Sequence, residues 1–162
     1  MSLLLVFACL LVVTGFASAN WDNLGHNSTS HKHILAFGDS LTEGYGEDYN
    51  RVFQGLQSLY ASSRAHGARV LALTVLETRM GKEYPTHDVP RQKLNELIRN
   101  TAKDSDYITL LDTEKLLPYP VSPDADPEAA LLWDDGLHLT PMGYDKLGHL
   151  VFEALKNKLE VP

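Results

Sequence analysis

Three short apolar runs alternate with segments of helical periodicity along this chain. The runs at residues 34–37, 70–75 and 107–111 are continuous and rich in Ile, Leu and Val, which predicts buried parallel strands. Residues 51–66 repeat apolar positions at helical spacing, and the predicted inward face comprises Val52, Phe53, Leu56, Leu59 and Tyr60. Gly67 follows and suits a helix stop.

Two further helices are predicted in the second half of the chain. Pro90 begins one of them, with inward positions at Leu94, Leu97 and Ile98. Thr140 and Pro141 suit the N-cap and first position of the last helix, whose apolar side holds Tyr144, Leu147, Val151, Leu155 and Leu159. Residues 77–89 and 117–134 are predicted to be loops. The order of strands and helices predicts an α/β domain with a parallel sheet and helices on its faces.

The N-terminal segment, residues 1–19, is mostly apolar and ends in the letters ASA, a small-x-small cleavage pattern. Its apolar run is short for a membrane span and has no polar face, which disfavours both a membrane anchor and a buried N-terminal helix. We therefore predict a removable signal peptide and a secreted, extracellular protein. Residues 20–33 are polar and predict a flexible lead-in. A glycosylation sequon beginning at Asn27 fits this prediction.

Composition excludes several classes of site. The chain has 162 residues, a net charge of −7 and one cysteine, Cys9, which lies in the predicted signal peptide. A mature chain would therefore have neither a disulfide nor a thiolate site. The acidic balance and the absence of a basic block disfavour binding to nucleic acid or an anionic membrane. His26, His31 and His33 are interpreted as a solvated tail, because no acidic or thiolate ligand accompanies them.

Ser40 directly follows the first predicted strand. A serine hydroxyl is a weak nucleophile unless a base lies within hydrogen-bond reach and a third group orients that base. Asp135 and His138 offer such a pair just before the last helix, with Gly136 allowing a tight turn and Asp134 as a rival orienting carboxylate. Either motif alone is typical of an ordinary turn or helix cap. Their joint placement on loops next to strand and helix ends favours a nucleophile and its base.

These two blocks resemble those of the GDSL, or SGNH, lipase and acylhydrolase family. The letters FGDSLTEGYG are similar to the serine block of that family, and DDGLHLTPMGY is similar to its Asp-x-x-His block. The resemblance implies a hydrolase domain over residues 34–160 with a flavodoxin-like three-layer α/β/α fold. It also implies that Ser40 is the nucleophile, His138 its base and Asp135 the orienting carboxylate, with no metal or organic cofactor.

Two internal blocks of that family are missing, and the domain is shortened between residues 46 and 51. The missing Gly and Gly-x-Asn-Asp blocks supply oxyanion donors, and no Asn-Asp dipeptide occurs in this sequence. A strand-helix-strand unit needs roughly 30 residues, for which there is no room between Ser40 and the strand at residues 70–75. We expect a truncated parallel sheet in which residues 34–37 pair directly with that strand, or else leave an open apolar edge. The Ser40 backbone N–H remains as a donor, and Asn50 is a candidate substitute.

The leading functional hypothesis is a secreted serine hydrolase that cleaves carboxylic esters through an acyl-enzyme. Its substrate would be a small ester, a lipid ester or an acylated sugar. The alternative is a catalytically impaired or inactive remnant with at most a binding role. A flavodoxin-like cofactor binder is disfavoured, because the loop after Phe37 has no phosphate-cradling glycine pattern.

Overall fold

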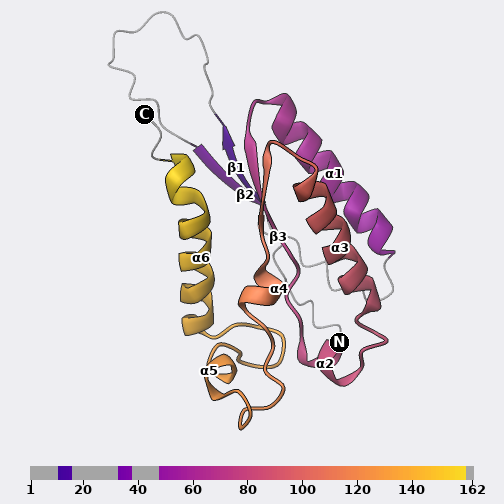
Figure 1. Ribbon diagram of the computed structural model, residues 1–162, viewed down its shortest axis with the longest axis vertical. Coiled ribbons are helices and arrows are strands. Elements are labelled where there is room, and N and C mark those ends of the chain that lie inside the picture. The colour runs from indigo at the N-terminus through magenta and orange to yellow at the C-terminus, as the bar shows by residue number, and fades with distance from the viewer. Residues whose placement is uncertain (1–10, 16–32, 38–47, 160–162) are drawn as a thin grey trace, which may run out of the picture.

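The computed structural model describes residues 11–15, 33–37 and 48–159 (Figure 1). Within them the elements are, in chain order, β1 (Leu11–Gly15), β2 (His33–Phe37), α1 (Tyr49–Ala65), β3 (Arg69–Leu73), α2 (Arg79–Glu83), α3 (Val89–Lys103), β4 (Ile108–Leu111), α4 (Thr113–Leu116), α5 (Pro127–Ala130) and α6 (Pro141–Leu159). Ser40, Asn27 and the predicted cleavage site lie outside the described residues.

The strands form one sheet in the order β2-β1-β3-β4. Strand β1 is antiparallel to both β2 and β3, whereas β3 and β4 are parallel. Because Val12 pairs with Ala36 on one side and with Leu71 on the other, β2 and β3 run in the same direction with these residues level. The carboxyl ends of β2, β3 and β4 therefore share one edge of the sheet, as the alternation of strands and helices predicts.

Direct pairing of residues 34–37 with residues 70–75 is wrong, and so is a wholly parallel sheet. Strand β1 lies between these two strands, and only β3 and β4 form a parallel pair. The physical reason is that two apolar strands without a neighbour leave rows of backbone N–H and C=O groups unpaired. The apolar segment Leu11–Gly15 satisfies both rows at once, from within the stretch that the sequence predicts to be a signal peptide.

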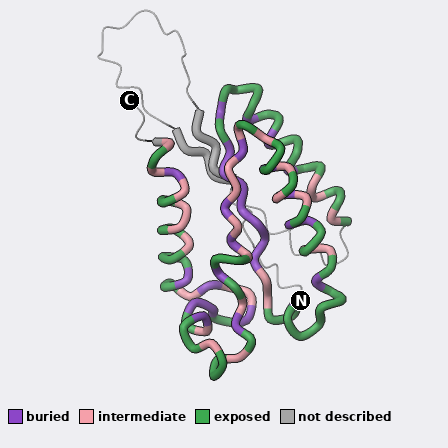
Figure 2. The backbone as a smooth tube through the Cα atoms, viewed as in Figure 1, coloured by how far each residue is buried: buried purple, intermediate pink, exposed green. Residues whose placement is uncertain are grey.

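Helices cover both faces of the sheet, which makes this an α/β structure (Figure 2). Val70, Ala72 and Ile108 face α1 and α3, where they pack with Leu56 and Ile98. The alternate strand residues face α6 on the other side, in a cluster made of Leu71, Leu73, Leu111 and Leu155. This alternation is what successive residues of a strand buried on both faces produce.

Signals in the sequence set two helix boundaries correctly. Gly67 has φ +69° just beyond α1, a left-handed conformation that glycine adopts without a steric penalty, which confirms the predicted helix stop. Thr140 Oγ1 accepts a hydrogen bond from the Gly143 N–H at 3.2 Å and caps α6 as predicted.

Other details differ from the prediction. Leu59 and Tyr144 were expected to face inward but are 37% and 52% exposed. Helix α1 packs through Leu56 and Tyr60. The apolar side chains of α6 join the core clusters only from Leu147 onward. The predicted loops at residues 77–89 and 117–134 contain α2 and α5. Helices this short have no apolar periodicity that a sequence could reveal.

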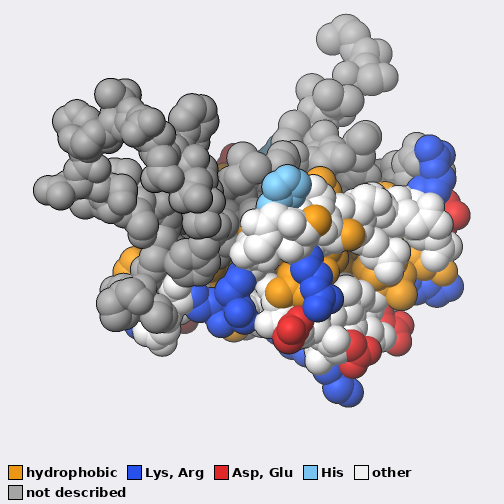
Figure 3. Space-filling model, turned by 90° about the horizontal axis from the view of Figure 1, so that it is seen from above, with side chains coloured by type: hydrophobic (Ala, Val, Ile, Leu, Met, Phe, Trp, Pro, Cys, Tyr) orange, Lys and Arg blue, Asp and Glu red, His pale blue; other side chains and the backbone are white. Residues whose placement is uncertain are grey.

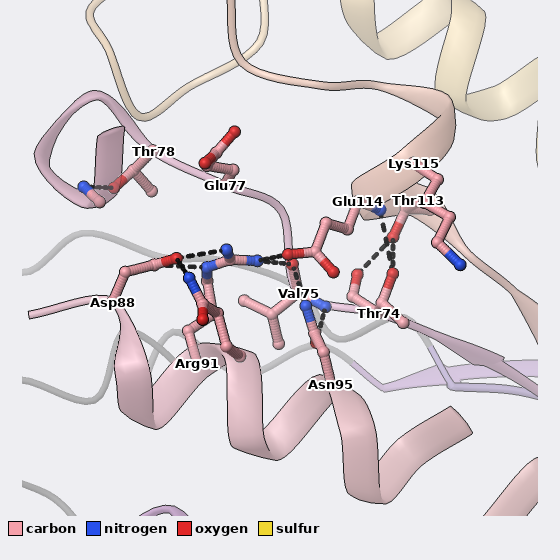
Figure 4. Close-up of polar contacts among 12 residues, drawn as sticks. Thr74, Val75, Glu77, Thr78, Asp88, Arg91, Asn95, Thr113, Glu114 and Lys115 are labelled. Atoms are coloured by element: carbon pink, nitrogen blue, oxygen red, sulfur yellow. Dashed lines mark hydrogen bonds and ion pairs between the residues drawn. The ribbon is translucent and has the colours of Figure 1, made fainter. Parts of the chain in front are cut away.

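A polar network joins α3 to the carboxyl ends of β3 and β4 (Figure 4). Arg91 donates to Asp88, to Glu114 at 2.6 Å and to the Val75 carbonyl at 2.9 Å. Arg99 pairs with Asp112 at 2.6 Å and also with Glu114. Burial raises the pKa of the Asp112 carboxyl, but hydrogen bonds from neighbouring side chains, chiefly Arg99, outweigh burial and lower it to about 2. The network therefore stays charged at neutral pH and fixes the segment that leaves β3.

Asn95 is the fully buried member of this region, and we predict that it stabilises the fold. Its amide accepts from the Val75 N–H at 2.7 Å and donates to the Val75 carbonyl at 2.8 Å, as a neighbouring strand would. Asn95→Ala leaves the buried Val75 N–H unpaired, while Arg91 still donates to the Val75 carbonyl, and it should lower the free energy of unfolding by about 1–3 kcal/mol. Urea denaturation checks this. Asn100→Ala, at an exposed position on the same helix, should change stability by less than about 0.5 kcal/mol.

Candidate active site

Asp135 and His138 meet in a tight turn between α5 and α6. His138 Nδ1 lies 2.6 Å from Asp135 Oδ2. The other carboxylate oxygen accepts from the backbone N–H groups of Leu137 at 3.0 Å and His138 at 2.8 Å. Asp135 thus fixes both the ring and the backbone of His138. Because Nδ1 faces the carboxylate, a proton taken up by the neutral imidazole would go to Nε2.

The structure distinguishes between the two candidate carboxylates. Asp135 contacts the His138 ring, whereas Asp134 contributes its backbone N–H, which donates to the His138 carbonyl at 2.8 Å. Hydrogen bonds from the His138 backbone, and then from its ring, lower the pKa of the Asp135 carboxyl to about 2. Asp135 is therefore ionised throughout the pH range in which a histidine can act as a base.

The turn rests on a small apolar cluster below it. Trp133 and Leu139 flank the turn, pair as an antiparallel bridge and pack with Leu76, Leu117 and Leu132. The Trp133 indole N–H donates to the Pro118 carbonyl at 3.2 Å, and its ring meets Tyr119 edge-on. This packing fixes the backbone of the turn, although the side chains of Asp135 and His138 are 51% and 30% exposed.

Gly136 is required in this turn for two reasons. Its φ of +92° is a conformation that residues with a Cβ rarely adopt. A Cβ at this position would also come within 2.9 Å of Arg79 Cβ, because the Arg79 side chain lies across the turn. The Arg79 backbone N–H donates to the Gly136 carbonyl at 2.8 Å, which ties the start of α2 to the turn. Sequence reasoning missed Arg79, since nothing in its local sequence signals this long-range contact.

Of the other two predicted site residues, Ser40 lies outside the described residues and Asn50 lies in α1. Ser40 is not described, but β2 ends at Phe37 on the edge where β3 leads toward Arg79 and the turn. Asn50 lies in the first turn of α1, where its side-chain amide donates to Asp48 Oδ1 at 2.8 Å. Asn50 thus takes part in capping α1.

A shallow pocket between α1 and α3 lies at the opposite end of the molecule, near the start of β3. Its lining includes Arg64, which sits over the Tyr107 ring at 4.9 Å, and Ser105, but no histidine. Figure 3 looks onto that end and shows Lys and Arg side chains beside Asp and Glu side chains. The pocket holds Ser105 and the carboxylates of Asp104 and Asp106 but no imidazole, so the Asp135–His138 turn is the better candidate. In the described part of the chain, no group of three His, Cys, Asp or Glu residues could hold a metal ion.

No protein-family model, no curated protein and no solved structure matches this chain. None of the helices among the described residues is both long and apolar enough to cross a membrane. Function is therefore inferred from the chemistry of the turn and from the motifs in the sequence.

Proposed function

We propose that this protein is a secreted serine hydrolase of the GDSL/SGNH type that cleaves carboxylic esters. The 2.6 Å contact between His138 Nδ1 and Asp135 Oδ2 is the observation that supports this proposal most directly. Such a carboxylate–imidazole pair is what a serine nucleophile needs. Strand β2, which precedes Ser40 in the sequence, ends at the edge of the sheet from which β3 leads to Arg79. The helices on both faces of the sheet support the three layers that this family would require, although the antiparallel β1 departs from the parallel sheet of a flavodoxin-like fold.

The reaction divides into two steps. Ser40 Oγ attacks the ester carbonyl while His138 Nε2 takes the hydroxyl proton, and the C–O bond to the alcohol breaks as His138 returns that proton to the leaving oxygen. His138 then takes a proton from a water molecule as its oxygen attacks the acyl carbonyl, and returns that proton to Ser40 Oγ as the bond between Oγ and the acyl carbon breaks and the acid leaves. Asp135 keeps the ring oriented and stabilises the imidazolium that forms in each step.

Stabilisation of the oxyanion is the weak part of this site. The Ser40 backbone N–H is the donor that the sequence retains, and the Asn50 amide already donates to Asp48 in this structure. Each lost donor costs roughly 100- to 1000-fold in rate. This favours a slow hydrolase that depends on activated or tightly bound esters. The loss of oxyanion donors also supports the alternative function, an impaired form that binds an ester without hydrolysing it.

A comparison of the full chain with Ser40→Ala tests the proposal. With a chromogenic short-chain ester such as 4-nitrophenyl butyrate, the full chain should exceed the variant by about tenfold or more, because only the nucleophile differs. Matching thermal melts would show that both proteins are folded. Equal rates would eliminate the hydrolase and leave the binding remnant.

A further inference from the structure

The guanidinium of Arg79 lies directly on the candidate catalytic turn. The positions of Arg79 Nε and Cζ are 3.0 Å and 3.2 Å from the place that a Cβ on Gly136 would occupy. The Arg79 backbone N–H anchors the same residue to the Gly136 carbonyl at 2.8 Å. Arg79 is nevertheless exposed to solvent, while Gly136 is buried beneath it. The exposed Arg79 guanidinium thus lies against Gly136, two positions before His138 in the sequence.

The carboxylates near Arg79 are engaged elsewhere. Asp135 accepts hydrogen bonds from the Leu137 and His138 backbones and from the His138 ring. Glu77 pairs with Lys82 at 2.9 Å. The ion pairs formed among the described residues do not include Arg79, and Asp134 does not come within ion-pair distance of it. Among the described residues, the Arg79 guanidinium therefore has no carboxylate to bind.

We propose that Arg79 binds a carboxylate on the substrate, so that the preferred esters carry a second, anionic group. This inference rests on the proposed function, because it places that anion beside the ester attacked by Ser40. A guanidinium presents parallel N–H donors that match a carboxylate. The backbone contact and the packing on Gly136 hold it in place, which reduces the entropy lost on binding. In a chain with net charge −7, a local cation is needed to attract such a substrate.

The test compares two esters that differ in charge but hardly in shape. The mono-4-nitrophenyl ester of adipic acid ends in a carboxylate, and 4-nitrophenyl 6-methylheptanoate ends in an isopropyl group instead. We expect Arg79→Gln to lower the ratio of kcat/KM for the anionic ester to that for the neutral ester roughly 5- to 20-fold. Lys82→Gln is the control: it removes a cation from the same helix, one that already pairs with Glu77, and it should leave the ratio unchanged.

The ratio of the two kcat/KM values does not depend on the amount of folded enzyme. A purely structural role for Arg79 therefore predicts no change in this ratio. An unchanged ratio in Arg79→Gln, or an equal fall in Lys82→Gln, would overturn the proposal.

A binding measurement separates this inference from the proposed function. If the full chain turns over neither ester faster than Ser40→Ala, the hydrolase is wrong, but Arg79 can still be tested. Monomethyl adipate is titrated into the full chain while the Gly136 and His138 amide resonances are followed. Saturable shifts that Arg79→Gln abolishes would support the anion site. Absence of shifts in the full chain would reject it.

Discussion

Asp135→Asn is expected to lower kcat for ester hydrolysis by about 1000- to 10,000-fold while the fold is retained. The amide oxygen could still accept the backbone N–H groups of Leu137 and His138, so the turn should persist. Its NH₂ group would then face His138 Nδ1, which forces the ring proton onto Nε2. The nitrogen that should take the Ser40 proton would already carry one. Steady-state kinetics with a chromogenic ester, together with a thermal melt, measure both parts of this expectation.

Asp134→Asn is the matched control for that variant. It removes the negative charge of Asp134, the residue before Asp135, whose carboxylate does not contact the His138 ring. The kcat should therefore change less than about threefold. If Asp134→Asn were the damaging variant and Asp135→Asn the mild one, the observed pairing would not be the catalytic one.

Removal of residues 1–19 is expected to destabilise the protein by about 5 kcal/mol or more, which is comparable to the whole stability of many domains. Strand β1 supplies the ladder partner of both β2 and β3, and its loss would leave two rows of backbone groups unpaired. Circular dichroism during urea denaturation would show a low midpoint or no cooperative transition in the shortened chain. In the full chain, Val13→Pro should cost about 3 kcal/mol, because Val13 pairs on both sides.

The same experiment decides between two roles for the N-terminal segment. Cleavage after Ala19, as the signal-peptide prediction requires, would remove β1 from the sheet. If the chain from Asn20 melts at the same urea concentration as the full chain, β1 is dispensable and cleavage is compatible with a stable domain. Strong destabilisation would mean that the segment is retained as a strand in the folded protein.

Local patterns predicted most of the elements around the sheet. Apolar runs identify β2, β3 and β4, and Gly67 and Thr140 mark helix boundaries because their effects are confined to one turn. The Asp135–His138 contact was also predictable, since a spacing of three residues with glycine between them permits only a short turn.

Long-range contacts account for what the sequence did not reveal. The insertion of β1 depends on which strands lack neighbours, and this is a property of the whole sheet rather than of Leu11–Gly15. The contact of Arg79 with Gly136 and the pairing of Asn95 with Val75 join segments that are far apart in the chain. No local periodicity encodes such pairs.

Covalent trapping tests directly whether Ser40 is a nucleophile activated by His138. A fluorophosphonate reacts with a serine whose hydroxyl is activated by a neighbouring base, and it forms a stable adduct without needing turnover. We expect one adduct per full chain, mapped to Ser40 by mass spectrometry, with none in Ser40→Ala and a much slower reaction in His138→Gln. An unmodified full chain, or an adduct that persists in Ser40→Ala, would contradict it.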